Sequence, residues 1–532
     1  MSDRFMCEVC GEPSRFKCSS CQAVHYCCKD HQKEDWKNHK STCFSYKIVI
    51  NDELGRHLVA TRSIPEGTII LTERPLVVGP AQVTPPVCLG CYKLLQANSK
   101  KDCSKCGWPI CSKVCEKSDA HVAECEVTAR RGNGKIKIRT FIEGLPHPSY
   151  QCLTILRCLY LKNSKPHVWK KLINLQSHCE KRKTSPKYCA DQLFIAKFIP
   201  EFLNYTEFSN EEIMRVAGIV QVNAHEVPLK NPGYVAIYEK ASFLEHSCKA
   251  NCIKSFTNSG NLVIRSSGNI APGDHLSICY TDPLWGRRAR ICHLIETKFF
   301  LCRCPRCSDP TEIGTHFNSV RCTKNCGDYC IPMVGMNEVN FETGSYSETE
   351  GDQMWNCQKC NSVSLAETKL LLDIEQAVQQ LDKTNVTACK AFLKKYEEVL
   401  HPNHHLMVRV KLALIDLMAW QDKLSAIDDE DLSWTIKTCR EVHDLCSVLI
   451  PAENRLAGVI LYQLQLALME SGRRKTKQSR TSSAELKHNL LECRDVLTKA
   501  HRYLNYEPNE LPEGKMAVEA KRALENLNKI IQ

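Results

Sequence analysis

The sequence predicts a multidomain α+β protein, and three observations support this fold class. The chain has 532 residues, which exceeds what one hydrophobic core holds and predicts three or four units. Alternating β-branched residues mark two separated strand regions in the first half, whereas the last third shows only helical spacing of apolar residues. In addition, 34 Cys gather mostly in short pairs, which predicts small metal-binding modules.

The composition is that of a globular protein. Hydrophobic residues make up 43% and charged residues 25%, which excludes global disorder, coiled coil and collagen. The first ten residues are polar and contain a Cys pair, so we expect no signal peptide. The most apolar stretch, 456–469, has 14 residues and contains Gln463 and Gln465, whereas a membrane span needs about 20 apolar residues. We therefore expect a soluble intracellular protein, cytoplasmic, nuclear or both, with no membrane partner.

Paired cysteines in a reducing compartment indicate metal binding rather than disulfides. The formal charge of +11 would suggest a nucleic-acid partner. However, the 21 candidate thiolates and six Zn²⁺ ions expected below reduce this charge to about +2. The sequence also lacks a basic stripe interleaved with aromatic residues, so direct nucleic-acid binding is the least favoured of three interpretations.

The first module, residues 1–45, contains eight candidate zinc ligands in pairs. The pairs follow CxxC, CxxC, CxxxH and HxxxC patterns, and two or three intervening residues let both ligands reach one metal ion. Without metal, so small a segment would lack a core. The expected assignment is interleaved, with Cys7, Cys10, Cys27 and His31 on one ion and Cys18, Cys21, His39 and Cys43 on the other.

The same eight-ligand order recurs in residues 87–126 and predicts a second module of this kind. Between the two modules, GRHLVATRSIPEGTIILTERPLVVG (55–79) alternates β-branched residues around a Pro-Glu-Gly turn, which predicts three short strands. The ligand candidates of the second module are Cys88, Cys91, Cys103, Cys106, Cys111, Cys115, His121 and Cys125.

The rest of the chain divides into a helical, a strand-rich and a second helical region. Residues 140–208 show helical spacing, and 233–280 return to alternating runs with a Pro-Gly-Asp turn. A Cys-rich tract, FFLCRCPRC, follows. Residues 365–532 predict six or seven amphipathic helices. RRKTKQSRTSS (473–483) predicts an exposed loop between two of them, for which nuclear localisation is a minor alternative.

These motifs resemble a known family. YCCKDHQKEDWKNHKSTC (26–43) resembles the MYND zinc finger, with His31 in place of a usual Cys. GRHL at 55–58, EHSCKAN at 245–251, PGDHLSICY at 272–280 and CRCPRC at 302–307 resemble the split SET domain. Their order resembles the SMYD family of protein-lysine methyltransferases, and the extra N-terminal finger resembles its arthropod-type branch.

The resemblance implies a β-rich SET domain split by an inserted zinc finger, small zinc modules and an all-α, TPR-like C-terminal domain. The expected domains are the N-terminal MYND-type finger (1–45), the first SET half (46–86), the inserted MYND-type finger (87–126), a helical SET insert (127–208), the second SET half (209–285), a post-SET zinc segment (286–310), a zinc-ribbon-like insert (311–364) and the helical C-terminal domain (365–532).

Two further zinc sites are expected. The family fold implies that Cys248 joins the CxCxxC motif, because three thiolates leave a structural zinc one ligand short. The expected ligands there are Cys248, Cys302, Cys304 and Cys307. Two later pairs, Cys322, Cys326, Cys357 and Cys360, predict a zinc ribbon, with Cys330 as an alternative ligand. The remaining cysteines, including Cys152, Cys158, Cys179, Cys189, Cys389 and Cys439, are expected to be buried small hydrophobes.

The resemblance implies S-adenosyl-L-methionine as cofactor and Tyr280 as the catalytic residue that orients the substrate amine. The implied cofactor-binding residues are Gly55, Arg56, His57, His178, Asn223, Glu245, His246, Tyr280 and Phe300. Each of three residues also has an alternative interpretation without a functional role. Tyr280 could be an ordinary Tyr of a strand, His178 a surface His of a helix and Asn223 a residue of a turn.

Four pocket positions depart from the family pattern. His57 replaces the second Gly of the cofactor turn, and Glu245 replaces an Asn, although a carboxylate cannot donate as an amide does. His225 and Lys298 stand where the channel is usually aromatic. A Lys298 ammonium repels both a sulfonium and an arriving lysine unless it turns outward. These departures predict weakened cofactor binding and turnover.

The favoured function is methyl transfer from S-adenosylmethionine to a protein lysine. The alternative is a catalytically weak or inactive scaffold that recruits partners through its C-terminal helices and binds proline-rich peptides with its MYND fingers. We expect a monomer with about six zinc ions, four of them in the two fingers. Cofactor binding separates the two hypotheses, because a scaffold has no need of it.

Overall fold

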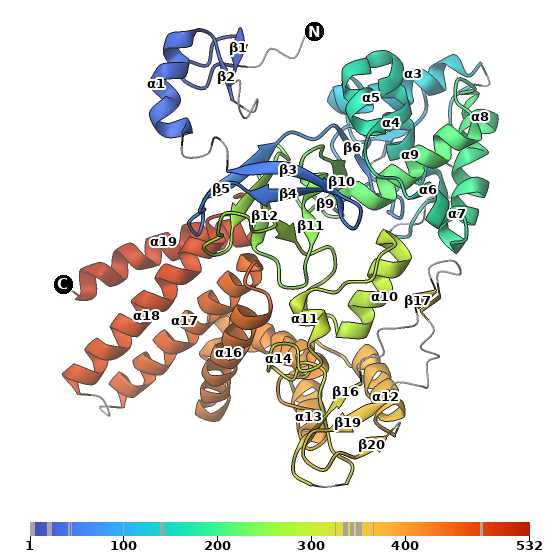
Figure 1. The fold of residues 1–532 in the computed structure, drawn as a ribbon. Helices are drawn as coiled ribbons and strands as arrows, with labels where there is room; N and C mark the ends of the chain where they lie inside the picture. Colours follow the sequence, from blue (N-terminus) through green and yellow to red (C-terminus); the bar gives the residue numbers. More distant parts are fainter. Residues whose placement is uncertain are drawn as a thin grey trace.

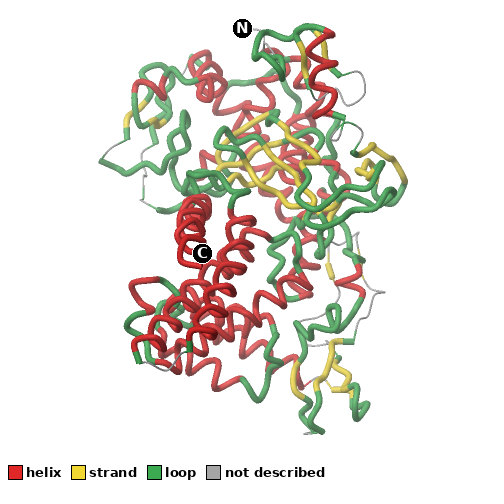
Figure 2. The backbone as a smooth tube through the Cα atoms, turned by 90° about the vertical axis from the view of Figure 1, so that its left-hand side faces the viewer, coloured by secondary structure: helices red, strands yellow, loops and turns green. Residues whose placement is uncertain are grey.

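The computed structural model describes residues 6–18, 24–40, 43, 45–98, 100–132, 134–138, 142, 144–324, 326–333, 339–340, 345–346, 354–364, 366–478 and 482–531. Figure 1 shows the central strands lying between a group of helices near α4 (Leu153–Ser164) and α9 (Asn210–Asn223) and the long C-terminal helices. In Figure 2 most strands gather in the middle of the molecule, with the long C-terminal helices below them.

The N-terminal finger is a small unit with its own core. It contains β1 (Phe16–Lys17), β2 (His25–Tyr26) and α1 (Lys29–His39), and the Cys28 side chain caps α1 by accepting from the His31 amide. Its buried side chains form a separate cluster of Cys7, Cys18, Tyr26 and Cys43. Figure 1 shows this finger at one end of the molecule.

Strands from two distant parts of the sequence build the SET body. β5 (Ile69–Glu73) pairs with β13 (Leu262–Ser266), which pairs with β12 (Cys252–Phe256). β6 (Val77–Pro80) pairs with β10 (Tyr234–Ile237), which pairs with β9 (Ala224–Val227). Alternating apolar residues bury one face of these strands, so pairing joins the two halves into one core.

Two short pairings complete the strands around the candidate pocket. The hairpin of β3 (Tyr46–Asn51) and β4 (Gly55–Ala60) begins its return at Gly55, which has a φ of +66° that suits glycine. β11 (Glu245–His246) pairs in parallel with β14 (Ser277–Ile278). This parallel contact brings the EHSC motif beside the strand that leads to Tyr280.

The inserted finger and the helical insert pack against the same core. The finger comprises β7 (Lys101–Asp102), β8 (Pro109–Ile110), α2 (Lys113–Glu116), the 3₁₀ turn Asp119–His121 and α3 (Val122–Arg130). The helices that follow are α4 (Leu153–Ser164), α5 (Pro166–Ile173), α6 (Cys179–Arg182), α7 (Pro186–Asp191), α8 (Phe198–Leu203) and α9 (Asn210–Asn223). α9 starts with a Ser209–Glu212 capping box and buries Val216, Ala217 and Ile219 against this core.

A short region connects the SET body to the C-terminal helices. It begins with α10 (Arg287–Lys298) and α11 (Pro305–Ser308). An antiparallel sheet follows, in the order β15 (Val320–Arg321), β16 (Tyr329–Pro332), β19 (Trp355–Cys357) and β20 (Val363–Ser364), with β17 (Val339–Asn340) and β18 (Ser345–Tyr346) paired separately.

The C-terminal region is all-helical, as expected. Residues 366–531 as described contain eight helices rather than six or seven, one of them the four-residue α15. They are α12 (Ala366–Gln380), α13 (Val386–Tyr396), α14 (His405–Met418), α15 (Gln421–Leu424), α16 (Asp429–Leu449), α17 (Asn454–Lys477), α18 (Ser483–Leu504) and α19 (Pro512–Ile531). Within the described part of the chain, none of the helices combines the length and apolar character that crossing a bilayer requires.

The expectation of a loop over residues 473–483 is wrong for the first part of this segment. α17 continues through Lys477, and only residues 479–481 of this segment lie outside the described residues. Arg473 and Arg474 both donate to Glu470, at 2.7 and 2.8 Å, and Arg474 also reaches Asp429 at 2.7 Å. Ion pairs between residues three or four positions apart stabilise a helix, so α17 continues here. The many basic residues of this segment led to the expectation of a loop.

Candidate functional site

Among the described residues, at least five groups of four side chains are placed as candidate metal ligands. In each group the ligand atoms all lie within 4.8 Å of one another. The groups are Cys7, Cys10, Cys27 and His31; Cys88, Cys91, Cys111 and Cys115; Cys103, Cys106, His121 and Cys125; Cys248, Cys302, Cys304 and Cys307; and Cys322, Cys326, Cys357 and Cys360. The interleaved pairing is therefore present in the inserted finger and in the first site of the N-terminal finger.

The sulfur spacing suits tetrahedral zinc. Four thiolates at about 2.3 Å from one ion stand about 3.8 Å apart. The measured Sγ–Sγ distances are 3.5 Å for Cys10 and Cys27, 3.6 Å for Cys91 and Cys111, and 3.5 Å for Cys248 and Cys307. A disulfide needs about 2.05 Å, so these cysteines are free thiols, spaced as zinc ligands are.

The second site of the N-terminal finger is described in part. Cys18 Sγ lies 3.6 Å from Cys43 Sγ, and both side chains are buried, as is the His39 ring. The fourth expected ligand, Cys21, lies outside the described residues.

The remaining cysteines largely follow expectation. Cys330 is buried in β16 opposite Cys357, but it does not belong to the group of four that includes Cys357. Cys152, Cys158, Cys389 and Cys439 are fully buried, as expected. The expectation was wrong for Cys189, which is exposed on α7, and Cys179 is half-buried, because these short helices present only one face to the core.

A buried polar chain holds the inserted finger to the SET body. His121, a candidate ligand, donates through Nδ1 to the Glu124 carboxylate at 2.8 Å, which leaves Nε2 for a metal ion. Arg157 of α4 donates to the same carboxylate at 2.7 Å. It also donates to the Val78 and Leu89 carbonyls, at 3.1 and 3.0 Å. Pairing with Arg157 lowers the pKa of Glu124 although burial opposes this.

A second buried chain supports the group around Cys248, which we call the post-SET wall (Cys248, Cys302, Cys304 and Cys307). Glu312 accepts from Arg290 at 3.0 Å and from Arg306 at 2.5 Å, and all three side chains are fully buried. Arg306 also donates to the Cys248 carbonyl at 3.3 Å. The wall therefore rests on a paired charge cluster rather than on an apolar core alone.

Sequence reasoning missed both of these supporting chains. Glu124 and Arg157 are 33 residues apart, and Arg290 and Glu312 are 22 apart. Residues this far apart in sequence follow no helical or strand spacing, so the sequence does not indicate that they form an ion pair. The one available signal is that Glu124 lies three residues after the candidate ligand His121, on the same helical face.

Tyr280, His246, Phe300 and Lys298 come together beside the post-SET wall, and we call this group the Tyr280 centre. His246 Nδ1 accepts from the Tyr280 backbone amide at 3.0 Å, and its Nε2 lies 3.3 Å from Cys248 Sγ. The His246 ring is 5.2 Å from the Tyr280 ring and 5.9 Å from the Phe300 ring, centroid to centroid. Burial raises the pKa of the Tyr280 hydroxyl, which donates to the Leu244 carbonyl. Tyr280 is therefore a constrained, protonated residue at a junction of elements rather than an ordinary strand Tyr.

Lys298 points into this centre instead of outward. Its Nζ donates to the Val222 carbonyl at 2.7 Å and lies 3.4 Å from the Gln221 carbonyl, both at the C-terminal end of α9. The same Nζ lies 5.5 Å from the Tyr280 ring centroid. Burial, with help from nearby Lys254, lowers the pKa of Lys298 to about 8. The outward orientation that would spare the channel a cation is absent.

His178 and Asn223 line the adjoining segment. His178 precedes α6 with a left-handed φ of +46°, and its ring lies 5.7 Å from the Phe299 ring, so it is not a surface helix His. Burial, then Lys181 and Lys298, lower the pKa of His178 to about 4, so the ring is neutral. Asn223 ends α9 and donates both amide hydrogens, to the Gln176 and Ile219 carbonyls. Its side-chain oxygen is the group left to accept from a ligand.

The β3–β4 end carries two further residues that the resemblance implies for the cofactor, Arg56 and His57. Arg56 donates to the Asn174 carbonyl and lies 4.5 Å above the Phe243 ring centroid. His57 turns back to the Gly55 carbonyl, at 3.1 Å, and is buried.

Glu245 turns towards His275, whose Nδ1 is 3.0 Å from its carboxylate. The His275 ring in turn lies 4.7 Å from the His57 ring. Two of the departures from the family pattern, His57 and Glu245, are therefore connected through one histidine. The other departing histidine, His225, is half-buried with its ring 5.7 Å from the Tyr238 ring, and desolvation, then Lys254 and Lys298, lower its pKa well below the ordinary value.

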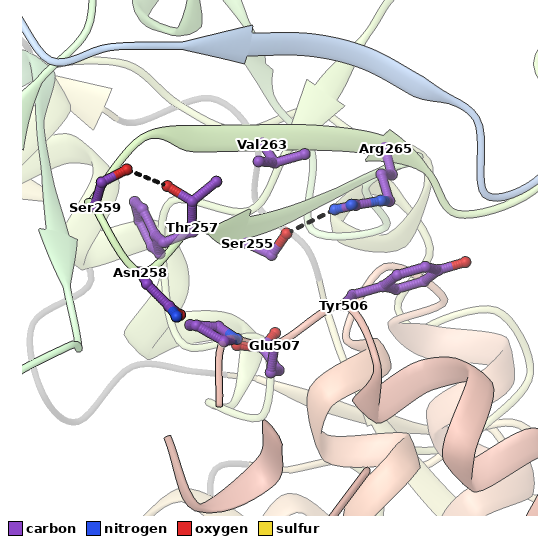
Figure 3. Close-up of a pocket in the computed structure, with 10 residues that line it drawn as sticks. Ser255, Thr257, Asn258, Ser259, Val263, Arg265, Tyr506 and Glu507 are labelled. Carbon is purple, nitrogen blue, oxygen red and sulfur yellow. Dashed lines mark hydrogen bonds between the residues drawn. The ribbon is translucent and has the colours of Figure 1, made fainter. Parts of the chain in front are cut away.

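A separate pocket of about 490 Å³ opens between the β12–β13 hairpin and the turn after α18 (Figure 3). Arg265 donates to the Ser255 hydroxyl at 3.0 Å and lies 4.8 Å from the Tyr506 ring centroid. Figure 3 shows Thr257 and Ser259 at the opposite end of the pocket from Arg265, with Glu507 below and between the two ends. Burial raises the pKa of the Glu507 carboxyl to about 7. The pocket thus offers one cation, one weak acid and an aromatic face.

Comparison with known proteins identifies two domains. A SET domain family model matches residues 55–281, and a MYND finger model matches residues 7–43. The SET domain-containing protein SmydA-8, isoform A, of Drosophila melanogaster is 28% identical over 286 residues, covering 52% of this chain and 60% of that protein. Histone-lysine N-methyltransferase ASHR1 of Arabidopsis thaliana is 24% identical over 426 residues, covering 77% and 83%.

Two further matches are shorter or weaker. Histone-lysine N-methyltransferase SMYD3 of Mus musculus is 38% identical over 73 residues, covering 14% of this chain and 17% of that protein. The crystal structure of the SET domain of LSMT bound to lysine and AdoHcy covers 94% of this chain and 92% of that chain at 11% identity, with a TM-score of 0.24, too low to carry an argument. The chain spans about 60% of the length of the SmydA-8 isoforms that it matches.

Proposed function

This chain is a SET and MYND domain protein of the SMYD family, and from that premise we propose that it transfers a methyl group from S-adenosylmethionine to a lysine side chain of a protein. The observation that carries the proposal is the Tyr280 centre. There a half-buried, protonated Tyr is held against a neutral His246 and a four-cysteine wall, where an arriving amine could be oriented. Burial lowers the pKa of His246 to about 4.

The residues present fit this cofactor. A Cβ placed on Gly55 meets no atom within 4 Å, so the space beside the β3–β4 turn is open. The resemblance assigns to the same cofactor the neutral rings of His178 and His246, the side-chain oxygen of Asn223 and the Glu245 carboxylate. The cofactor would supply an electrophilic methyl group on a sulfonium. Gly55, Arg56 and Asn223 would hold it, and Phe300 would cover it.

The protein's own residues would provide orientation and desolvation. The Tyr280 hydroxyl is fixed on a backbone carbonyl and would hold the acceptor amine in line. A dry channel favours the neutral amine, because burial disfavours the ammonium. The pocket in Figure 3, with Arg265 and Glu507, is proposed to read residues that flank the target lysine.

Calorimetric titration with S-adenosylmethionine, followed by methyl transfer to proteins of a cell lysate, tests this function. Glu245→Asn with Lys298→Tyr should raise transfer, because an amide returns to the cofactor and an aromatic wall replaces a cation. Adding Tyr280→Phe to that variant should then lower the rate by about 10-fold or more, since the hydroxyl is lost and the shape kept. A restored variant that binds cofactor but transfers no methyl group would overturn the proposal.

A second function is favoured by the same departures. Lys298 inside the centre and Glu245 turned towards His275 both weaken a family-like pocket. A scaffold with a weak or inactive SET domain would still present the N-terminal finger, whose Met6, Phe16 and Trp36 are exposed apolar side chains suited to proline-rich peptides. Such a protein would bind peptides but give no calorimetric signal with the cofactor.

We also propose about six zinc ions per chain, in a monomer. Four would lie in the two fingers, one in the post-SET wall and one in the ribbon. Elemental analysis of the purified protein should find this number, and three or fewer would contradict the assignment.

A further inference from the structure

The Tyr280 centre contains an amine that belongs to the chain itself. Lys298 is the last residue of α10, and the turn at Phe299, with a φ of +63°, ends that helix directly after it. The side chain extends inward, so Nζ lies 5.5 Å from the Tyr280 ring centroid. Tyr280 is the residue proposed to orient an acceptor amine, and the Lys298 amine lies over its ring.

The hydrogen bonds of Lys298 leave a lone pair available. A neutral amine has two hydrogens and one lone pair, whereas an ammonium has three hydrogens. The Val222 carbonyl lies at 2.7 Å and the Gln221 carbonyl at 3.4 Å, so two acceptors take two hydrogens. Both carbonyls lie at the end of α9, and neither of them uses the lone pair of the neutral amine, which is left for an electrophile.

The surroundings favour the neutral form of this amine. Burial lowers the pKa of Lys298 to about 8, so a large fraction is unprotonated at mildly alkaline pH, whereas a free lysine with a pKa of about 10.4 is not. Lys254 is the cation that adds to this shift. The three nearby histidines, His178, His225 and His246, have lowered pKa values and are neutral.

We propose that Lys298 is a methylation site of this protein, accepting the methyl group within its own Tyr280 centre. The proposal rests on the proposed function. The Nζ lone pair forms the new N–C bond to the methyl carbon, and the S–C bond breaks with its electron pair remaining on sulfur, which leaves a neutral thioether. The methylated Nζ then releases one proton to water, so charge and atoms balance.

Methylation would change the centre that performs it. Each methyl group removes one N–H, and the longer of the two carbonyl contacts, to Gln221, is the one most easily lost. The methylated side chain is larger and less able to donate, so it fits the carbonyl pair at the end of α9 less well. A lysine from another protein would then enter a channel in which the methylated Lys298 side chain occupies a different position.

The first measurement is the mass of the Lys298 peptide. The full-length protein is digested as purified, before any cofactor is added, and again after incubation with isotopically labelled S-adenosylmethionine. We expect unlabelled methyl groups on Lys298 in the purified protein, and labelled ones to increase with time. Lys298→Arg should lower incorporation into the chain at least about 10-fold, because a guanidinium is not a nucleophile at this pH.

A matched control uses Lys254→Arg. Lys254 is exposed on β12 and electrostatically coupled to Lys298, but it makes no contact with the Tyr280 ring in the described structure. This variant keeps the charge, so labelling at Lys298 should continue. Transfer within one chain is tested by mixing the wild-type protein with a tagged Tyr280→Phe chain. The tagged chain should remain unlabelled at Lys298, and the rate per chain should not depend on concentration.

The outcomes separate this inference from the proposed function. Cofactor binding with methyl transfer to lysate proteins, but an unmethylated Lys298, overturns the inference and leaves the function standing. Label on the tagged Tyr280→Phe chain overturns transfer within one chain. A protein with full zinc content that binds no cofactor and carries no methyl group at Lys298 overturns both.

Discussion

The two finger regions have the same ligand order but different relations to the rest of the molecule. Tyr26 and the cysteines of the N-terminal finger form a cluster of their own. The buried residues of the inserted finger, among them Leu89, Trp108 and Ile110, belong to the main SET core. The inserted finger is also joined to α4 by the buried chain from His121 through Glu124 to Arg157.

A zinc-ligand pattern therefore specifies the local fold of a finger but not whether that finger supports the rest of the molecule. Each finger is too small to hold itself together without metal. In the inserted finger, however, metal binding also fixes the position of Glu124 and therefore of Arg157. Loss of metal there should spread into the SET body, whereas loss from the N-terminal finger should stay local.

The largest expected effect separates the two fingers directly. Cys106→Ser in the inserted finger should abolish cooperative unfolding of the SET body, because its metal group adjoins Trp108 and the His121 chain. The matched variant Cys10→Ser should leave the main melting transition unchanged. Circular dichroism melts with zinc analysis measure both. Equal effects of the two substitutions would remove the distinction between the fingers.

Breaking the buried pair alone should have the next largest effect. Arg157→Met leaves Glu124, which is fully buried, without its cation, and should lower the free energy of unfolding by about 3–5 kcal/mol. The control is Arg130→Met on α3, whose pair with Glu126 is largely exposed and should contribute less than about 1 kcal/mol. Urea denaturation measures both values, and similar losses would mean that the buried pair does not hold the finger.

The junction with the C-terminal helices offers a third kind of contact, half-buried and sensitive to pH. Glu507 has a pKa of about 7 in the folded chain, above the ordinary value of about 4.3. Between these values the folded state holds a proton that the unfolded state has lost, so stability falls as pH rises from about 4.5 to 7.

Glu507→Gln should therefore stabilise the chain at pH 8 by on the order of 1 kcal/mol, since the side chain keeps some access to water, and should have no effect near pH 4. Thermal melts across this pH range measure the difference. A constant difference at all pH values would assign the effect to packing rather than to the proton.

The smallest expected effect is that of removing the N-terminal finger. Deletion of residues 1–43 should leave the main melting temperature within about 2 °C of the full chain, because β3 starts after the deleted segment and keeps its pairing with β4. Calorimetry of the two proteins makes the comparison. A truncated chain that is insoluble or melts without cooperativity would show that the finger is part of the body.

Local patterns determined much of this protein from the sequence alone. Ligand pairs two or three residues apart can reach one ion in almost any fold, and the structure brings the described members of both fingers and of the ribbon together. Alternating strands and helical spacing after residue 365 likewise depend on short-range geometry, and these elements formed where expected, whereas α9 (Asn210–Asn223) was not predicted. The loop at 473–483 was wrong because ion pairs along α17 outweighed its basic composition.

Tertiary structure alone decided how distant residues meet. Cys248 reaches the CxCxxC motif only because β11 pairs in parallel with β14, and the family resemblance, not the spacing, predicted it. The inward direction of Lys298 depends on where the end of α9 places the Val222 carbonyl, 76 residues away. Whether a finger stands apart or joins the core depends on buried partners such as Arg157. No periodicity encodes such contacts, because folding joins chain segments whose separation in sequence carries no information about their distance in space.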